Sequence, residues 1–557
     1  MNHDLFKTEI ARNTFYNKYA HSNSDNWGNL SRRLISDVCG RGSGNLLHPI
    51  LDKQSREQLV VHHNAMRFVA GGRYLYYAGR PLHAFNNCFL LRAEEDTREE
   101  WSNLIWRANS CLMLGGGIGI DYSRIRPSGR MLSRTGGIAS GPLPLMNMIN
   151  EIGRNVMQGG SRRSAMYASL NWKHEDVEMF LKMKNHHDMI VPGTNISVWD
   201  TKNAEFNWPA PMDTTNISVN YDDEWLTKVG RETDPIFLEN VRQAMTTGEP
   251  GFSFNFGDKE NETLRNACTE VTSEDDSDVC NLGSINMGNI ETLDEFREVV
   301  QLASKFLVCG TVRADLPYSK VSEVREKNRR LGLGLMGIHE WLLKRGHGYE
   351  VVPELKQWLE VYRDESKKSA DEHCDRLYLS RPVAYRSIAP TGSLSMLAST
   401  TSGIEPLFAV AYKRRYLTEG TRWKYEYAID NRAEILMNEF GVKADDIETS
   451  YSLAQNPEKR IKFQADIQDY IDMGISSTIN LPSWGDRGNS EADIDSFAET
   501  LSRYAPRLRG FTCYPNGSRG GQPLTEIEYD EAIKHKGVVY EEQDVCDITG
   551  KGGACGV

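Results

Sequence analysis

Two kinds of segment alternate along most of this 557-residue chain, and the alternation restricts the folds open to it. Short runs rich in apolar and β-branched residues, such as MIVPGTNISVWD (189–200) and TTNISVNYDDEWL (214–226), are typical of strands. Longer segments such as NRRLGLGLMGIHEWLLK (328–344) and DESKKSADEHCDRLY (364–378) are helix-like. The alternation predicts an α/β architecture. The pentapeptide TNISV occurs in both strand-like runs, and we interpret its two copies as similar strands.

The N-terminal region differs from the rest, because it is largely helix-like apart from the break CGRGSGNLLHP (39–49). No apolar run reaches the roughly eighteen residues of a membrane span, and the N-terminus has no apolar signal core. We therefore expect a soluble, cytoplasmic protein (in the host cytoplasm if the chain is viral) that has no membrane partner.

The charge balance limits the possible partners. The net charge is -12 and the pI is about 5.7. Nucleic-acid binders normally present a basic face, so we expect no nucleic-acid partner, and a bound nucleotide is expected to be small. Ten cysteines are too few for a disulfide scaffold in a chain of this length, which favours catalytic or redox-active roles for those that matter.

One acidic stretch, RNACTEVTSEDDSDVC (265–280), contains two of these cysteines. Structural zinc sites usually bring their cysteines in close C-x2-4-C pairs, and the chain has none, so zinc is disfavoured. If the segment is extended, Asn266, Cys268 and Glu270 project from one face. An amide, a thiol and a carboxylate together could orient a hydroxyl, perform radical or nucleophilic chemistry and act as a general base. The alternative is an acidic surface loop with a buried cysteine.

The sequence around this stretch resembles the catalytic chain of ribonucleotide reductases, from about residue 10 to residue 530. The resemblance is carried by NNCFLL, GGGIGIDYSRIRPSGR, QGGSRRSAM, NACTE, CNLGSIN, RRLGLGLMGIHEWL, APTGSLSMLASTTSGIEPLF and YPNGSRGG. It implies a ten-stranded α/β barrel of two half-barrels, with a central finger loop that carries NACTE at its tip. We expect a helical N-terminal region over 1–80, the barrel over 81–530 and a flexible tail over 531–557.

The resemblance also implies the catalytic roles. Cys268 would become a thiyl radical that removes the ribose 3'-hydrogen, Glu270 would take the 3'-hydroxyl proton, and Asn266 would hold that hydroxyl. Cys88 and Cys280 would supply two electrons and end as a disulfide.

Further sites follow from the same resemblance. Substrate is expected at Asn87, Gly117, Pro390, Thr391, Gly392, Ser393, Leu394 and Ser395. A deoxynucleotide effector is expected at Arg126, Gln158 and Arg162, although Arg163 and Ser164 replace the glycine of many relatives in this loop. Cys546 and Cys555 are expected to relay electrons from thioredoxin or glutaredoxin, the alternative being a frayed terminus with incidental cysteines. No N-terminal ATP cone is recognisable, so overall control by ATP and dATP is not expected.

The source of the radical has two candidates. Relatives with a metal-containing radical subunit use two adjacent tyrosines near the last barrel strand, where this chain has Tyr514 alone. This favours adenosylcobalamin as the cofactor, with a viral-type chain activated by a separate small subunit as the alternative. Outside the family, a glycyl-radical enzyme is disfavoured because its C-terminal glycine motif is missing. A non-catalytic nucleotide-binding protein with structural thiols stays open.

Overall fold

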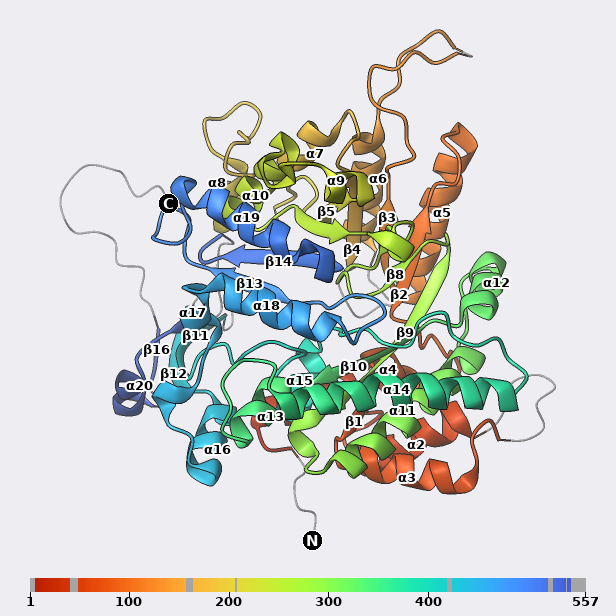
Figure 1. Cartoon of the computed structure of the whole chain (residues 1–557), viewed down its shortest axis with the longest axis vertical. Helices are drawn as coiled ribbons and strands as arrows, with labels where there is room; N and C mark the ends of the chain where they lie inside the picture. Colours follow the sequence, from red (N-terminus) through yellow and green to blue (C-terminus); the bar gives the residue numbers. More distant parts are fainter. Residues whose placement is uncertain are drawn as a thin grey trace.

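The structure is a computed structural model that describes residues 6–40, 49–133, 135–156, 164–205, 208–417, 423–518, 524–536 and 538–541. Three N-terminal helices, α1 (Glu9–Lys18), α2 (Trp27–Cys39) and α3 (Lys53–Asn64), confirm the predicted helical region (Figure 1). Each begins at a side-chain cap, at Thr8, Asn26 and Asp52 respectively, which satisfies a backbone N–H of the first turn. Within the described residues, none of the helices is long and apolar enough to cross a membrane.

A mixed sheet of ten strands forms the centre of the molecule. Its strands are β1 (Phe68–Ala70), β2 (Cys88–Arg92), β3 (Gly117–Asp121), β4 (Met166–Asn171), β5 (Thr215–Tyr221), β6 (Gly251–Phe254), β9 (Asp278–Asn286), β10 (Leu331–Met336), β13 (Thr478–Leu481) and β14 (Gly510–Pro515). Strands β2 to β6 are parallel neighbours, as are β9 with β10 and β13 with β14. Antiparallel pairs join these parallel groups, at β2 with β9 and at β6 with β14.

Extended segments outside the named strands continue the pairing beyond β10. Leu333 of β10 is bridged to Arg386, and Ile388 is bridged to Ile475. The chain then passes from Ile475 into β13, which pairs with β14. The segment 473–481 therefore connects β13 with the extended segment at Ile388, which follows the bridge to β10.

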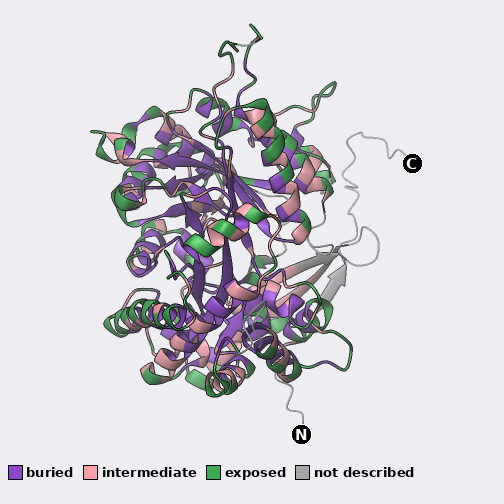
Figure 2. Ribbon diagram, turned by 90° about the vertical axis from the view of Figure 1, so that its right-hand side faces the viewer, coloured by how far each residue is buried: buried purple, intermediate pink, exposed green. Residues whose placement is uncertain are grey.

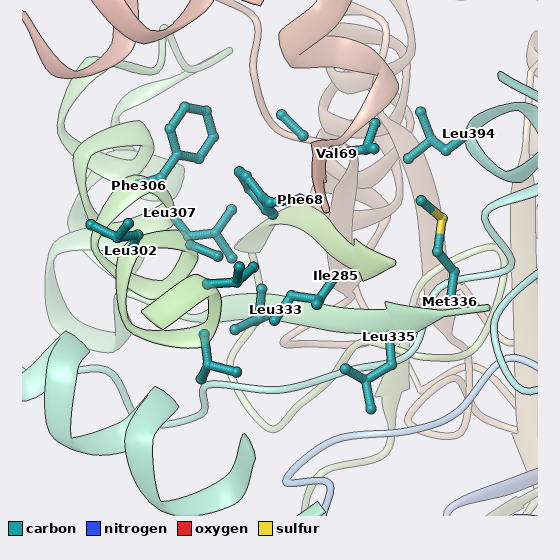
Figure 3. Packing of buried hydrophobic residues seen from close by; sticks show 14 of the residues in the cluster. Phe68, Val69, Ile285, Leu302, Phe306, Leu307, Leu333, Leu335, Met336 and Leu394 are labelled. Carbon is teal, nitrogen blue, oxygen red and sulfur yellow. The ribbon is translucent and has the colours of Figure 1, made fainter. Parts of the chain in front are cut away.

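Helices cover the outside of the sheet, as Figures 1 and 2 show: the strands are mostly buried, and the outer helices have exposed faces. The long ones are α5 (Arg98–Leu114), α6 (Pro142–Asn155), α10 (Pro235–Thr247), α11 (Leu293–Arg313), α12 (Ser319–Asn328), α14 (Pro353–Arg376), α16 (Asn431–Phe440), α18 (Pro457–Gln468) and α19 (Ile494–Tyr504). Two large apolar clusters lie between helices and sheet, and Figure 3 shows part of one, where Phe306 and Leu307 pack near Phe68 and Leu333. The near-continuous burial of the strands agrees with parallel strands covered on both faces.

Shorter elements complete the fold. The short helices are α4 (Gly72–Tyr77), α7 (Val177–Lys182), α8 (Val198–Ala204), α9 (Asp223–Thr227), α13 (Ile338–Lys344), α15 (Gly392–Ala398), α17 (Ser450–Ala454) and α20 (Tyr529–His535). A four-stranded sheet has the order β15 (Leu524–Glu526), β11 (Ala411–Leu417), β12 (Trp423–Ile429), β16 (Val539–Glu541). Helix α20 and strand β16 lie in or next to the predicted tail, so the described part of that tail has regular structure.

Two local predictions are wrong. The run 189–200 is not a strand: Pro192 and Gly193 form a turn, with Gly193 at a φ of 79°, and α8 begins at Val198. Only the second TNISV copy, in β5, is a strand. The first half of 328–344 is strand β10 rather than helix, because LGLGLM alternates with period two and glycine disfavours helix interiors.

Candidate functional site

The stretch that carries Asn266, Cys268 and Glu270 is the tip of a hairpin. Its arms are β7 (Leu264–Arg265) and β8 (Thr272–Ser273), paired antiparallel. The Thr269 amide donates to the Asn266 carbonyl at 3.0 Å, and Thr269 has a positive φ of 68°, so the tip is a tight turn. The side chains therefore meet through a turn, and not along one face of an extended strand as the spacing suggested.

Asn266 is the centre of the hydrogen bonding at the site. Its Nδ2 donates to Glu270 Oε2 at 2.9 Å and to Cys88 Sγ at 3.0 Å. Its Oδ1 accepts from the Val271 amide at 3.0 Å, which fixes the orientation of the side-chain amide. One amide group thus connects the hairpin tip with β2, far upstream in the sequence.

Glu270 is buried, and this determines its acidity. Burial raises the pKa of Glu270 to about 7, although the hydrogen bond from Asn266 acts in the opposite direction. A carboxylate with a pKa near neutrality can both accept and return a proton at physiological pH.

Cys88 and Cys280 lie directly opposite each other in the antiparallel pair of β2 and β9. Such partners have Cα atoms about 4.5–5.5 Å apart, which falls within the range of a disulfide. Both thiols are buried in a small apolar cluster of Cys88, Leu90, Leu264, Val271, Cys280, Leu282, Ala384 and Met473. Burial raises the pKa of both thiols well above the usual range, and the nearby Glu270 raises that of Cys88 further. Both are therefore protonated at neutral pH.

Cys268 differs from these two cysteines, because it is exposed at the end of the hairpin while Asn266 and Glu270 are buried. Its side chain is accessible to solvent, whereas those of Asn266 and Glu270 are not. The hairpin thus presents an accessible thiol next to an enclosed carboxylate, amide and dithiol.

Two residues that support the hairpin were not among the predicted site residues. A Cβ on Gly119 of β3 would stand 1.6 Å from the Arg265 carbonyl oxygen, so any larger residue would displace the hairpin. The guanidinium of Arg265, fully buried, donates to Asn255 Oδ1 at 2.7 Å and to the Arg509 carbonyl at 2.9 Å. The repeated glycines of GGGIGI were a sequence signal for this close approach, whereas nothing in the sequence identified Arg265.

The predicted phosphate loop, residues 390–395, leads into α15. Thr391 has a positive φ of 52°, a strained conformation for a residue with a side chain. No described atom lies within 4 Å of the position that a Cβ on Gly392 would take, so packing within the described chain does not require glycine there. Lys18 of α1 donates to the Ser393 hydroxyl at 3.2 Å.

The remaining predicted residues are distributed as follows. Gly117 pairs with Cys88 in the sheet, and a Cβ on it would stand 3.7 Å from that of Ala267 in the hairpin tip. The Asn87 amide donates to the Cys280 carbonyl at 3.2 Å, while Asn87 Oδ1 is buried without a hydrogen-bond partner among the described atoms. The backbone amide of Arg126 donates to the Asp96 carboxylate at 3.0 Å, and its guanidinium donates to the Asp96 carbonyl at 2.9 Å.

Four of the predicted residues, Gln158, Arg162, Cys546 and Cys555, lie outside the described residues. Within the described part of the chain, no three His, Cys, Asp or Glu side chains converge in a way that could hold a metal ion.

The chain was compared with known proteins. It is 28% identical over 519 residues to the vitamin B12-dependent ribonucleoside-diphosphate reductase of Thermoplasma acidophilum, a match covering 83% of this chain and 65% of that protein. The corresponding protein of Mycobacterium tuberculosis is 27% identical over 515 residues, covering 83% of this chain and 72% of the relative. The chain thus spans about two thirds of the length of these relatives.

A solved structure and a family model agree with these matches. The alpha subunit of the class Id ribonucleotide reductase of Actinobacillus ureae is similar in fold, with a TM-score of 0.70 and 17% identity, over 92% of this chain and 98% of that one. The family model described as "Ribonucleotide reductase, barrel domain" matches residues 86–356 and 381–505. The chain belongs to the ribonucleotide reductase family.

Proposed function

We propose that the chain reduces ribonucleotides to 2'-deoxyribonucleotides by a thiyl-radical mechanism, and so supplies precursors for DNA. The observation that carries this proposal is the Asn266 amide, which hydrogen-bonds both Glu270 and Cys88 beside the exposed Cys268. A base, a reducing thiol and a second, accessible thiol are thereby brought to one place. A purely structural set of thiols would need neither the accessible cysteine nor the buried carboxylate.

In the first half of the reaction, the Cys268 radical takes the 3'-hydrogen of the ribose and Glu270 takes the 3'-hydroxyl proton. The pKa of about 7 suits Glu270 for this transfer at neutral pH. Asn266 keeps Glu270 oriented and can share its amide with the same hydroxyl. Burial of the carboxylate excludes water from the proton transfer.

In the second half, Cys88 and Cys280 reduce the sugar. The two thiols give up two hydrogens, the 2'-hydroxyl leaves as water, and a disulfide joins the two sulfur atoms. Their raised pKa values support this role, because each sulfur still holds the proton that it must deliver. Cys546 and Cys555 then return electrons from thioredoxin or glutaredoxin, which as folded proteins cannot reach a buried pair.

The proposal includes closure of the ten-stranded sheet into a barrel of two half-barrels around the hairpin. The segment 473–481 supports it, because one end is bridged to Ile388 and the other pairs with β14. In addition, the Gly474 amide donates to the Glu270 carbonyl at 2.7 Å, so this segment also holds the hairpin tip.

Adenosylcobalamin is the radical source that we propose. When bound, it would supply the radical chemistry that converts the Cys268 thiol into the thiyl radical. The exposed Cys268 and the half-buried Thr269 would face it, and this exposure fits a bulky external group. The relatives from Thermoplasma acidophilum and Mycobacterium tuberculosis are named as vitamin B12-dependent. Activation by a separate metal-containing subunit is the second candidate, favoured by the class Id title of the similar structure.

The substrate phosphates are proposed to bind at residues 390–395. None of these six residues is charged, so a positive charge that pairs with the substrate phosphates must come from another part of the chain. The Thr391 hydroxyl accepts from the Gly403 amide at 3.0 Å, and the Ser395 and Ser402 hydroxyls are 2.6 Å apart. The Ser393 hydroxyl, by contrast, contacts Lys18, whose ammonium can pair with a phosphate oxygen beside the open space at Gly392. Arg126, Gln158 and Arg162 remain the proposed effector residues.

The test is incubation of the full chain with each ribonucleoside di- and triphosphate and a dithiol, with and without adenosylcobalamin, followed by chromatography of the deoxy product. We expect cobalamin-dependent product with wild type and none with Cys268→Ser, because an O–H bond is too strong to yield the radical. Product formed by Cys268→Ser would contradict the radical role. Activity that appears only with an added radical-generating subunit would select the second candidate instead of cobalamin.

A further inference from the structure

A second group of buried thiols lies among the helices outside the sheet. Cys39 is the last residue of α2, and Cys309 lies in α11, which packs against both α2 and α14. Both cysteines are fully buried in the same apolar cluster, and each thiol shifts the pKa of the other. His373 and Arg376 of α14 complete the group. None of these four residues takes part in the proposed reduction of nucleotides.

The hydrogen bonds define which sulfur accepts. Arg376 Nη2 lies 3.0 Å from His373 Nδ1, and a guanidinium can only donate, so Nδ1 must be an acceptor. The imidazole proton therefore sits on Nε2, which lies 3.5 Å from Cys309 Sγ and points a donor at it. The Cys309 sulfur therefore accepts a hydrogen bond from His373, and the Cys39 thiol is its neighbour in the same apolar cluster.

This arrangement favours a negative charge on Cys309. Burial on its own would raise the pKa of Cys309, but the hydrogen bonds from Cys39 and His373 outweigh burial and lower it. The pKa of Cys39 is raised, by burial and by the hydrogen bond with Cys309, so Cys39 keeps its proton. A thiolate in contact with a thiol is the pairing from which a disulfide forms most readily.

We propose that Cys39 and Cys309 are a second redox-active dithiol, which hydrogen peroxide converts into a disulfide between α2 and α11. The Cys309 thiolate attacks one peroxide oxygen, the O–O bond breaks, and Cys309 sulfenic acid and hydroxide form. The Cys39 sulfur then attacks the Cys309 sulfur, the S–O bond breaks, and the departing hydroxide takes the Cys39 proton as water. In total the two thiols lose two electrons, and the peroxide is reduced to two waters. The inference does not depend on the proposed nucleotide reduction.

The test is a peptide map of the full-length protein after graded exposure to hydrogen peroxide and alkylation of the remaining thiols. Trypsin yields LISDVCGR with Cys39, FLVCGTVR with Cys309 and SADEHCDR with Cys374. Cys374, a buried cysteine next to His373 in the sequence, is the matched control. Burial raises the pKa of the Cys374 thiol to about 12. We expect the linked peptide of Cys39 and Cys309 to appear at least severalfold faster than any oxidation of Cys374. Absence of the linked peptide, or equal oxidation of Cys374, would overturn the proposal.

A second measurement tests the role of His373. His373→Leu removes the donor to Cys309, whereas His373→Gln keeps an amide donor on a side chain of similar reach. We expect slower disulfide formation in the Leu variant and partial recovery in the Gln variant, with circular dichroism to establish that both are folded. A folded Leu variant that forms the disulfide at the wild-type rate would contradict the assignment. If the Leu variant does not fold, the map of the wild-type protein and the rate of the Gln variant decide the question.

Discussion

Among the described residues, two buried pairs of cysteines lie on opposite sides of strand β9, and their surroundings differ in one chemical respect. We call Cys88 with Cys280 the inner pair and Cys39 with Cys309 the outer pair. The inner pair faces the apolar cluster around the hairpin, and both of its thiols have raised pKa values. The residue after Cys280, Asn281, points the other way and donates to the Leu307 carbonyl of α11, on the side of the outer pair.

The difference shows that burial does not by itself decide what a cysteine can do. The inner pair is surrounded by apolar side chains and has a carboxylate nearby, so its sulfur atoms keep their hydrogens. In the outer pair, His373 donates to the Cys309 sulfur, which favours the thiolate. The inner pair is thus suited to giving up hydrogen, and the outer pair to attacking an oxidant.

The largest expected effect is the loss of deoxynucleotide formation in variants of the inner pair. Cys88→Ser and Cys280→Ser should each lower deoxynucleotide formation at least about a thousandfold, since a barrier increase of roughly 4 kcal/mol suffices for that loss. Removal of the 3'-hydrogen stays possible in these variants, so release of free base from the substrate is expected. Chromatography of nucleotide and base measures both products.

Cys39→Ser and Cys309→Ser are the matched controls for the inner pair. Each removes one buried sulfur but leaves the proposed reaction intact, so deoxynucleotide formation should stay near the wild-type rate. A loss as large as that of Cys88→Ser in a folded control would show that the division into two functions is wrong.

Glu270→Gln should have the next largest effect. The variant lacks the base, and general-base catalysis is worth roughly a hundredfold or more. The wild-type rate should rise as the pH increases through about 7, because the reactive form is the carboxylate, and this dependence should disappear in the variant. The pH profile of deoxynucleotide formation is the measurement, with Glu260→Gln, at an exposed residue, as the control.

Stability should depend on pH with opposite sign at the two sites. The pKa of Glu270 rises from 4.5 to about 7 on folding, so the folded state binds the proton more tightly, and the free energy of unfolding falls as pH rises through that window. At about 1.36 kcal/mol per pH unit, the loss relative to Glu270→Gln amounts to roughly 3 kcal/mol. The pKa of Cys309 is lowered instead, so its contribution is present at high pH and is lost as pH falls through its folded-state pKa.

Urea unfolding at a series of pH values, for wild type, Glu270→Gln and Cys309→Ser, measures both contributions. For each variant, the difference in the free energy of unfolding from wild type is plotted against pH. Slopes of the same sign for Glu270→Gln and Cys309→Ser would contradict the opposite pH dependence expected at the two sites.

The smallest expected effect lies outside both pairs. Lys18→Ala should raise the KM for the nucleotide roughly fivefold, the equivalent of about 1 kcal/mol for one solvent-exposed charge contact, with kcat nearly unchanged. Lys53→Ala, at an exposed lysine in α3, is the control. In Lys18→Ala, the disulfides of the inner pair and of the outer pair should form at the wild-type rate. An unchanged KM would remove Lys18 from the proposed phosphate site.

The sequence predicted the class of the fold better than the arrangement of the candidate site. The α/β pattern and the N-terminal helices could be inferred from periodicity, and the motifs singled out Asn266, Cys268 and Glu270 as candidates. The turn at the hairpin tip could not be predicted from the sequence, because Thr269 adopts a positive φ that its residue type does not indicate. The failure at 189–200 has a similar cause, since a turn at Pro192 and Gly193 overrides a strand-like composition.

The outer pair illustrates a second limit of sequence reasoning. Nothing in the sequence relates Cys39 to Cys309, and both are buried. Their contact depends on the packing of α2, α11 and α14, which are far apart in the chain. Likewise, Arg265 acts through Ser253 on β6 and through Arg509, just before β14, which only the folded sheet brings within reach.

Hydrogen bonds connect the segment 473–481 both to helix α18 and to the hairpin tip. The side chain of Gln468, the last residue of α18, donates to the Met473 carbonyl at 2.7 Å, and the next amide, that of Gly474, donates to the Glu270 carbonyl. A movement of the hairpin tip away from this segment therefore breaks the hydrogen bond from the Gly474 amide. Amide hydrogen exchange at Gly474 consequently reports each opening of the tip, and its rate measures how often Glu270 leaves its position.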